Sequence, residues 1–66
     1  SVSLRVYDMA GRRVRTLLNS TPLEAGEHSV RWDGHGDDGL RSAPGVYFYG
    51  LKVGGREQTR RAILLK

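Results

Sequence analysis

Glycine and proline divide this chain into short pieces. Nine glycines and two prolines are spread through 66 residues, and both residue types interrupt regular secondary structure and favour turns. Between them apolar and polar residues alternate with a period of two, which is typical of β-strands. We therefore predict an all-β fold, a small sandwich of about five antiparallel strands over residues 2–8, 12–19, 27–33, 45–53 and 56–65.

The first two predicted strands meet at a tight turn. Val2, Leu4 and Val6 share one face of the first strand. Asp8 and Gly11 then occupy the first and fourth positions of a four-residue turn. A type I turn favours these residues there, because the carboxylate accepts backbone N–H bonds and glycine tolerates positive φ. A hairpin is expected at this point.

The second predicted strand is less regular. Val14 and Leu18 keep one parity, whereas Leu17 falls on the other. A β-bulge near Thr16 would explain this pattern, and a helical turn would also fit the spacing. We favour the strand, because no capping residue precedes Arg12 and isolated helices of this length are unstable in water.

Trp32 is the expected core anchor of the third strand, after a loop that contains Gly26. His28, Val30 and Trp32 share the inward parity of that strand. The stretch that follows, residues 33–44, is too polar and glycine-rich for a strand and is predicted to be the long connection of the domain. Its expected turn-forming residues are Asp33, Gly34, Asp37 and Gly39.

Residues 45–53 form the densest apolar segment. The segment opens with Gly45, and Tyr47, Phe48 and Tyr49 place aromatic rings on both of its faces. This pattern predicts a central strand covered on both sides and favours core packing over an aromatic platform for nucleic acid or glycan. Gly54 and Gly55 predict a two-residue primed hairpin turn into the last strand.

The length limits the core that this chain can build. A domain of this size buries only about 60% of its unfolded surface, and the absence of cysteine excludes disulfides as support. The strand pattern begins at Val2 without a leader, from which we expect an excised fragment of a larger protein. No apolar run approaches the roughly 20 residues that span a bilayer, so we expect no membrane insertion.

The net charge of +4 suggests nucleic acid as a partner. Seven acidic residues are interspersed with the eleven basic ones, however, and this mixing argues against a basic binding stripe. Nucleic-acid binding therefore ranks below a role in protein interactions.

The chain offers no convincing catalytic group, and a metal site has one weak candidate. A hydrolytic triad needs a histidine or similar base with partners, and we interpret His28 as packed in a strand and His35 as exposed in a loop. Asp33, Asp37 and Asp38 could supply oxygen ligands to calcium. Their spacing fails the EF-hand pattern, and the alternative is that Asp33 and Asp37 fix turns by accepting backbone N–H bonds.

Several short motifs occur along the chain in this order: the run from Val6 to Val14, Ala25–His28, Trp32–Gly34, Gly39, Gly45–Tyr47 and Leu64–Lys66. Together they resemble FlgD-type Ig-like domains and the related C-terminal sorting domains of type IX secretion. The resemblance implies an Ig-like β-sandwich at the C-terminal end of a secreted or cell-surface protein, or within the flagellar hook-scaffolding protein. It also implies a further strand upstream of Val2, so that residues 1–66 would be an N-terminally truncated fragment at the C-terminal end of a larger protein. The loss of that strand would leave a sheet edge unpaired.

We accordingly expect a non-catalytic accessory module without a cofactor. Its expected partners are a domain of the parent protein or the secretion machinery, and in sorting-type members such a domain is an export signal. The alternative is self-assembly, in which strand pairing or swapping between copies forms a homo-oligomer.

Overall fold

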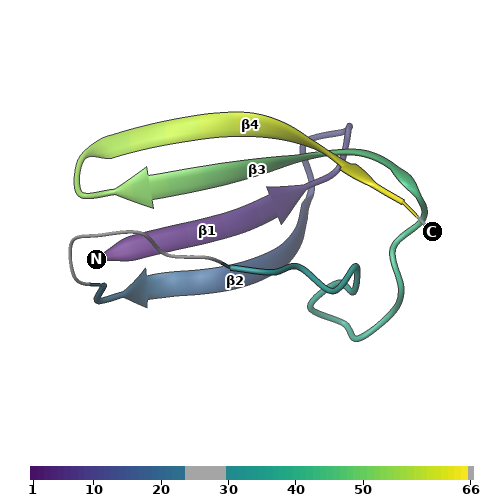
Figure 1. Ribbon diagram of the computed structural model, residues 1–66, viewed down its shortest axis with the longest axis horizontal. Coiled ribbons are helices and arrows are strands. Elements are labelled where there is room, and N and C mark those ends of the chain that lie inside the picture. The colour runs from purple at the N-terminus through teal and green to yellow at the C-terminus, as the bar shows by residue number, and fades with distance from the viewer. Residues whose placement is uncertain (24–29, 66) are drawn as a thin grey trace.

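The computed structural model describes residues 1–23 and 30–65 and contains four antiparallel strands. These are β1 (Val2–Tyr7), β2 (Arg13–Thr21), β3 (Gly45–Val53) and β4 (Arg56–Leu64). They form one sheet in the order β2-β1-β3-β4 (Figure 1). The described residues contain no helix, so the all-β prediction is confirmed. In particular, no long apolar helix that could span a bilayer occurs among them.

The β3–β4 hairpin is regular from end to end. Its pairs run from Gly45 opposite Leu64 to Val53 opposite Arg56 without a shift in register. The two-residue loop has φ of +58° at Gly54, the conformation that a primed turn requires at its first central position. The predicted turn is confirmed, and β3 lies in the centre of the sheet as expected. The prediction that both of its faces are covered is wrong for the described residues, because the connection packs on the Tyr47 face only.

The β1–β2 hairpin is irregular, and its irregularity lies in β2. Leu4 pairs with Leu18 and Arg5 with Thr16, so that Leu17 is an extra residue. The predicted bulge near Thr16 is confirmed, and the segment is a strand and not a helical turn. A further shift lies near Ser20, which has a positive φ of 48°. The Ser20 N–H donates to Ser3 Oγ at 3.0 Å and so satisfies a side chain that is almost fully buried.

The register divides the side chains between two faces of the sheet, because residues paired across strands point to the same side. We call one the covered face; it carries Leu4, Val6, Tyr47, Tyr49 and Leu51. The other is the open face, and it carries Tyr7, Val46, Phe48, Lys52, Glu57, Arg61 and Ile63.

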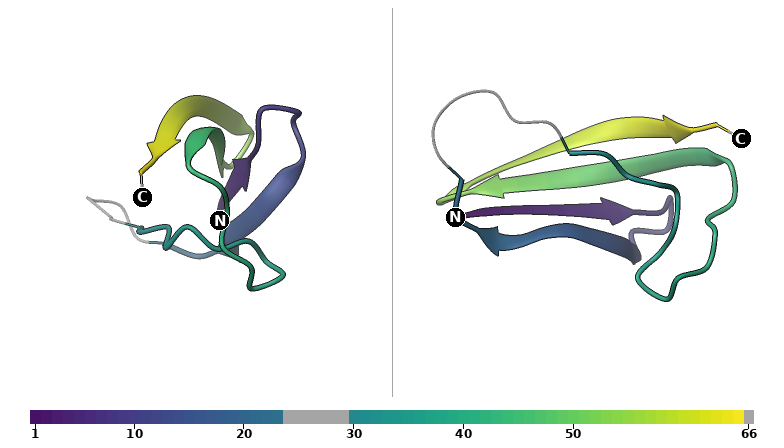
Figure 2. Two further views of the ribbon diagram at one scale, coloured as in Figure 1. Left: turned by 90° about the vertical axis from the view of Figure 1, so that its right-hand side faces the viewer. Right: turned by 60° about the horizontal axis from the view of Figure 1, so that its bottom comes forward.

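Residues 30–44 lie over the covered face. The Trp32 ring packs edge-on against Tyr47 with centroids 5.2 Å apart. The Tyr47 hydroxyl donates to the Ala43 carbonyl at 2.6 Å, and Gly34 approaches the Leu64 side chain so closely that an added Cβ would lie 3.4 Å from it. In the end-on view of Figure 2 the sheet is curved, and the teal segment crosses its concave side.

The third predicted strand, 27–33, is wrong in the part that the structure describes. Residues 30–33 are not in a strand, and residues 27–29 lie outside the described residues, as do Gly26 and His28. Both sides of β1 and β3 are already paired, so no inner edge is available to this segment. Trp32 instead packs on the face of the sheet, and Val30, expected inside, is 43% exposed.

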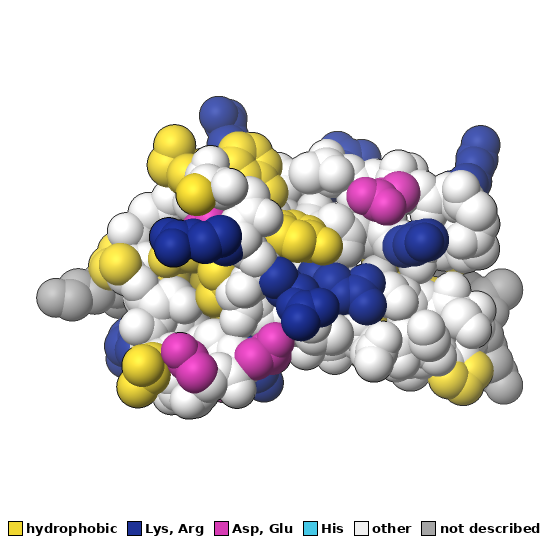
Figure 3. Space-filling model, turned by 180° about the vertical axis from the view of Figure 1, so that it is seen from behind, with side chains coloured by type: hydrophobic (Ala, Val, Ile, Leu, Met, Phe, Trp, Pro, Cys, Tyr) yellow, Lys and Arg dark blue, Asp and Glu magenta, His cyan; other side chains and the backbone are white. Residues whose placement is uncertain are grey.

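The core is small, as expected for this length. Val6 and Tyr47 are its buried hydrophobic residues among those described, at 3% and 9% exposure. No described segment crosses the open face as residues 30–44 cross the covered face; Ser3 there is buried beside Ser20, whereas Ile63 is 66% exposed. Figure 3 shows that side of the molecule, where hydrophobic side chains are interspersed with Lys and Arg. As far as the described residues show, the open face is therefore available for contact with another protein chain.

Candidate interaction site

The turn between β1 and β2 is held by the carboxylate of Asp8. Asp8 Oδ1 accepts from the backbone N–H groups of Ala10 and Arg12, each at 2.9 Å, and Oδ2 accepts from Arg12 Nε at 3.1 Å. Gly11 closes the turn with φ of +81° and donates to the Asp8 carbonyl at 3.0 Å. The Arg12 N–H bond, then that of Ala10 and the Arg12 charge, lower the pKa of Asp8 below 3.8. Both oxygens of this carboxylate are thus hydrogen-bonded within the turn.

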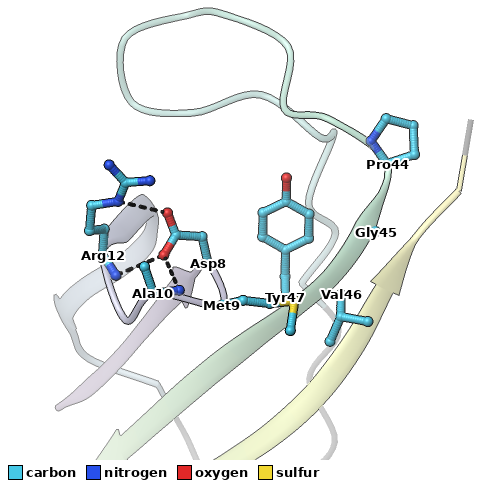
Figure 4. A pocket seen from close by; sticks show the side chains of 8 residues that line it. All are labelled: Asp8, Met9, Ala10, Arg12, Pro44, Gly45, Val46 and Tyr47. Atoms are coloured by element: carbon cyan, nitrogen blue, oxygen red, sulfur yellow. Dashed lines mark hydrogen bonds and ion pairs between the residues drawn. The ribbon is translucent and has the colours of Figure 1, made fainter.

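A shallow depression lies between this turn and the start of β3. Its lining comes from the Asp8–Arg12 turn and from residues 44–47 (Figure 4). The Asp8 oxygens are occupied by the three donors described above, and the Tyr47 hydroxyl donates to Ala43. The polar groups of Asp8 and Tyr47 in this depression are therefore engaged in local hydrogen bonds. We assign no catalytic or ligand-binding role to the depression.

Asp33 and Asp38 fix turns within the connection between residues 33 and 44. The Asp33 carboxylate accepts the His35 N–H at 2.9 Å, which is the main reason why the pKa of Asp33 falls below 3.8. The Asp38 carboxylate accepts the Leu40 N–H at 2.9 Å. Gly34 and Gly39 adopt the positive φ angles of +84° and +81°. The geometry of Asp33 therefore agrees with the turn-fixing interpretation, and Asp38, for which no such role was predicted, fixes a turn as well.

The turn-fixing role predicted for Asp37 is wrong, because its carboxylate reaches outside the connection and joins it to the outer edge of β2. Its N–H donates to the Val14 carbonyl at 2.9 Å, and its Oδ1 accepts the Thr16 N–H at 3.1 Å. Beside it Gly36 packs so tightly that an added Cβ would lie 3.2 Å from the Val14 oxygen. A single residue thus occupies two of the backbone groups that β2 would otherwise present to another chain, the Val14 carbonyl and the Thr16 N–H.

The calcium candidates do not converge. Asp33, Asp37 and Asp38 each bind a separate backbone N–H group, and no cluster of three or more potential ligands occurs among the residues described. His35 contributes a half-exposed ring, whose Nδ1 lies 3.5 Å from Asp33 Oδ1 without a hydrogen bond.

The aromatic residues of β3 divide between the two faces. Tyr47 and Tyr49 point to the covered face and Phe48 to the open face, as their pairing with Ala62, Arg60 and Arg61 shows. On the open face Tyr7 lies against Gly50, where an added Cβ would be 3.4 Å from the Tyr7 ring. The three rings do not form one continuous stacking platform.

The outer edge of β4 is the candidate interaction site. β4 is nine residues long and pairs with β3 on one side, and no described residue pairs with its other side. The first eight of the twelve described residues after Val53 are exposed, and the strand contains neither proline nor bulge. An unpaired and regular edge presents N–H and C=O groups to any extended chain.

The turns could be predicted from the sequence, whereas the state of the two sheet edges, at β2 and at β4, could not. Asp8, Gly11, Gly54 and Gly55 lie at the turns predicted for them, because the signal is local. The contact of Asp37 with β2 and the open edge of β4 were not found. The polar run from Arg56 to Arg61 was the available signal, since charged residues are typical of exposed edge strands.

The comparisons with known proteins agree with this architecture. Neither the curated proteins nor the solved structures contain a match to the chain. The model of the FlgD Ig-like domain family matches residues 1–57, which include β1, β2, the connection that carries Trp32, and β3. The matched part exceeds half of the chain, and the chain therefore belongs to the FlgD Ig-like domain family.

Proposed function

We propose that this chain is a non-catalytic accessory module of an exported or cell-surface protein. Membership of the FlgD Ig-like family favours an accessory role over an enzymatic one. The chemistry of the described residues is compatible with this role, since the carboxylates of Asp8, Asp33 and Asp37 are bonded to backbone N–H groups. The module works by presenting surfaces to other proteins, among them a domain of its parent protein or the secretion machinery.

The observation that carries the proposal is the outer edge of β4. One edge of the sheet, at β2, is bonded to Asp37, whereas the other edge is open along nine residues. Together with the uncovered face that carries Phe48 and Ile63, this edge offers both backbone and apolar contacts. A strand added to an open sheet edge is a common mode of protein recognition.

The proposal is tested in cells of the native host with the full-length protein that contains this chain. Fractionation should place the tagged protein in the medium or at the cell surface. Thr59→Pro removes an N–H that points away from β3, so the β3–β4 hydrogen bonds remain. This variant should fold, as judged by circular dichroism, and should lose surface retention or export.

Two results would contradict the proposal. The first is a protein confined to the cytoplasm. The second is a Thr59→Pro variant that folds, is found in the same cell fraction as the wild type and is retained there in the same amount. A proline placed elsewhere, such as Leu40→Pro, is not a suitable control for Thr59→Pro, because it would remove an N–H that is bonded to Asp38. Thr59→Val is the matched control, because it retains the outward N–H.

A further inference from the structure

The backbone of β4 presents alternate residues to its open side. In a two-residue hairpin the residues that flank the loop exchange both hydrogen bonds, here Val53 and Arg56. Counting along the strand from that pair, the residues with backbone groups directed toward β3 are Arg56, Gln58, Arg60, Ala62 and Leu64. The residues with outward N–H and C=O groups are therefore Glu57, Thr59, Arg61 and Ile63.

We propose that the occupant of this edge is the β4 strand of a second copy of the chain, in antiparallel pairing with Thr59 opposite Thr59. This inference rests on the proposed function and names the partner. An antiparallel pair that is hydrogen-bonded must join outward residues to outward residues. The register centred on Thr59 does so, because it sets Glu57 opposite Arg61 of the second copy, and the twofold axis repeats this contact.

Charge selects this register over its neighbours. Side chains directly opposite each other attract when their charges differ and repel when they are alike. In the register centred on Thr59, Glu57 meets Arg61 on the open face, and Gln58 meets Arg60 on the covered face. No like charges are directly opposite.

Each neighbouring register of the same parity places like charges opposite each other. Centring the pair on Gln58 sets Arg56 opposite Arg60, and centring it on Arg60 or on Arg61 sets that arginine opposite its own copy. Centring it on Glu57 opposes two carboxylates. The sequence of β4 is therefore complementary to itself in one register.

The assembly closes at two copies. Pairing of the two β4 strands gives one sheet whose outer strands are both β2. At each β2 edge, Asp37 binds the Val14 carbonyl and the Thr16 N–H. Because the bulge and this contact interrupt the ladder at β2, the dimer does not extend into a fibre.

The test is a charge exchange measured by sedimentation equilibrium. The wild-type chain should be a dimer. Glu57→Arg and Arg61→Glu should each raise the dimer Kd by roughly tenfold or more, because both symmetric pairs change from attraction to repulsion. An equimolar mixture of the two variants should restore dimers, since the heterodimer regains both opposite-charge pairs.

Arg60→Glu is the matched control for Arg61→Glu. It makes the same change in charge one residue away, but its side chain lies on the other face opposite an uncharged Gln58. Its dimer Kd should stay within a factor of about three of the wild-type value.

Cysteine cross-linking provides a second measurement that does not depend on the charge variants being folded. The chain has no cysteine. Thr59→Cys should form a disulfide-linked dimer on oxidation, because residues opposite each other in a hydrogen-bonded antiparallel pair have Cα atoms about 5.5 Å apart. Met9→Cys, exposed on the distant β1–β2 turn, should not.

A monomer at concentrations of about 100 µM would overturn the proposal, and so would folded charge variants that dimerise like the wild type or do not combine when mixed. Failure of cross-linking at Thr59 would overturn the register. None of these results bears on whether the full-length protein is exported, which fractionation tests separately. Failure of the pairing between copies can therefore be distinguished from failure of the proposed function.

Discussion

At the scale of single residues, the carboxylate of Asp8 connects sequence, turn geometry and pH. It accepts two backbone N–H groups and the Arg12 side chain, and these bonds favour its charged form. The pKa of Asp8 in the folded chain is accordingly below 3.8, and that of Asp33 is lowered for the same kind of reason. Both residues stabilise the fold above the unfolded pKa and lose that contribution as pH falls through the folded pKa.

Asp8→Asn should therefore weaken the acid sensitivity of the fold. The amide oxygen of Asn can still accept backbone N–H bonds, but it does not titrate. We expect a lower Tm than the wild type at about pH 7, and a difference that shrinks as the pH falls below about 4. Thermal melts at a series of pH values measure this. Parallel curves for the two proteins would contradict the assignment of acid sensitivity to Asp8.

At the scale of elements, the two edges of the sheet differ because of one loop residue. Asp37 binds the backbone of β2 beside its bulge, and Arg15 Nη1 adds a bond to the Gly36 carbonyl at 3.3 Å. β4 has no such contact among the described residues. The connection after Trp32 thus closes one edge and leaves the other to carry the interaction that we propose.

Asp37→Ala should open the β2 edge. It removes the acceptor of the Thr16 N–H, and the loss of one such bond should lower the free energy of unfolding by about 1 kcal/mol. Hydrogen exchange of the Thr16 amide should become faster. Asp38→Ala is the control, since Asp38 binds Leu40 within the loop and should leave Thr16 protected. Unchanged exchange at Thr16 in Asp37→Ala would show that Asp37 does not protect this edge.

At the scale of the whole molecule, one sheet is covered on one face by a segment without regular structure. Trp32 contacts Tyr47 and donates from Nε1 to the His35 carbonyl at 2.9 Å. With Val6 and Tyr47 as the buried hydrophobic residues among those described, few side chains contribute to the core. A domain of this size has little stability to lose.

Trp32→Ala should abolish cooperative unfolding or come close to it. Removal of a large, partly buried ring costs about 2–4 kcal/mol, a large share of the stability of so small a domain. Trp32→Phe should cost less, about 1 kcal/mol, because it retains a ring against Tyr47 and loses the bond to His35. Urea unfolding of both variants measures the difference. Equal losses would place the role of Trp32 in its hydrogen bond and not in its ring.

What the sequence by itself determined is local or periodic. The Asp8–Gly11 turn and the Gly54–Gly55 turn follow from the φ angles and side-chain bonds that these residues favour. Strands β1, β3 and β4 follow from the alternation of apolar and polar residues. The bulge in β2 follows from the interruption of that alternation at Leu17. Each of these features depends on residues a few positions apart.

Only the tertiary structure decided how the connection lies and which edge stays open. Alternation over 27–33 predicted a strand, but alternation does not reveal whether an edge is available to pair with, and residues 30–33 lie over the sheet instead. The bond between Thr16 and Asp37 joins residues 21 positions apart. Such contacts depend on the packing of the whole chain, and no short stretch of sequence encodes them.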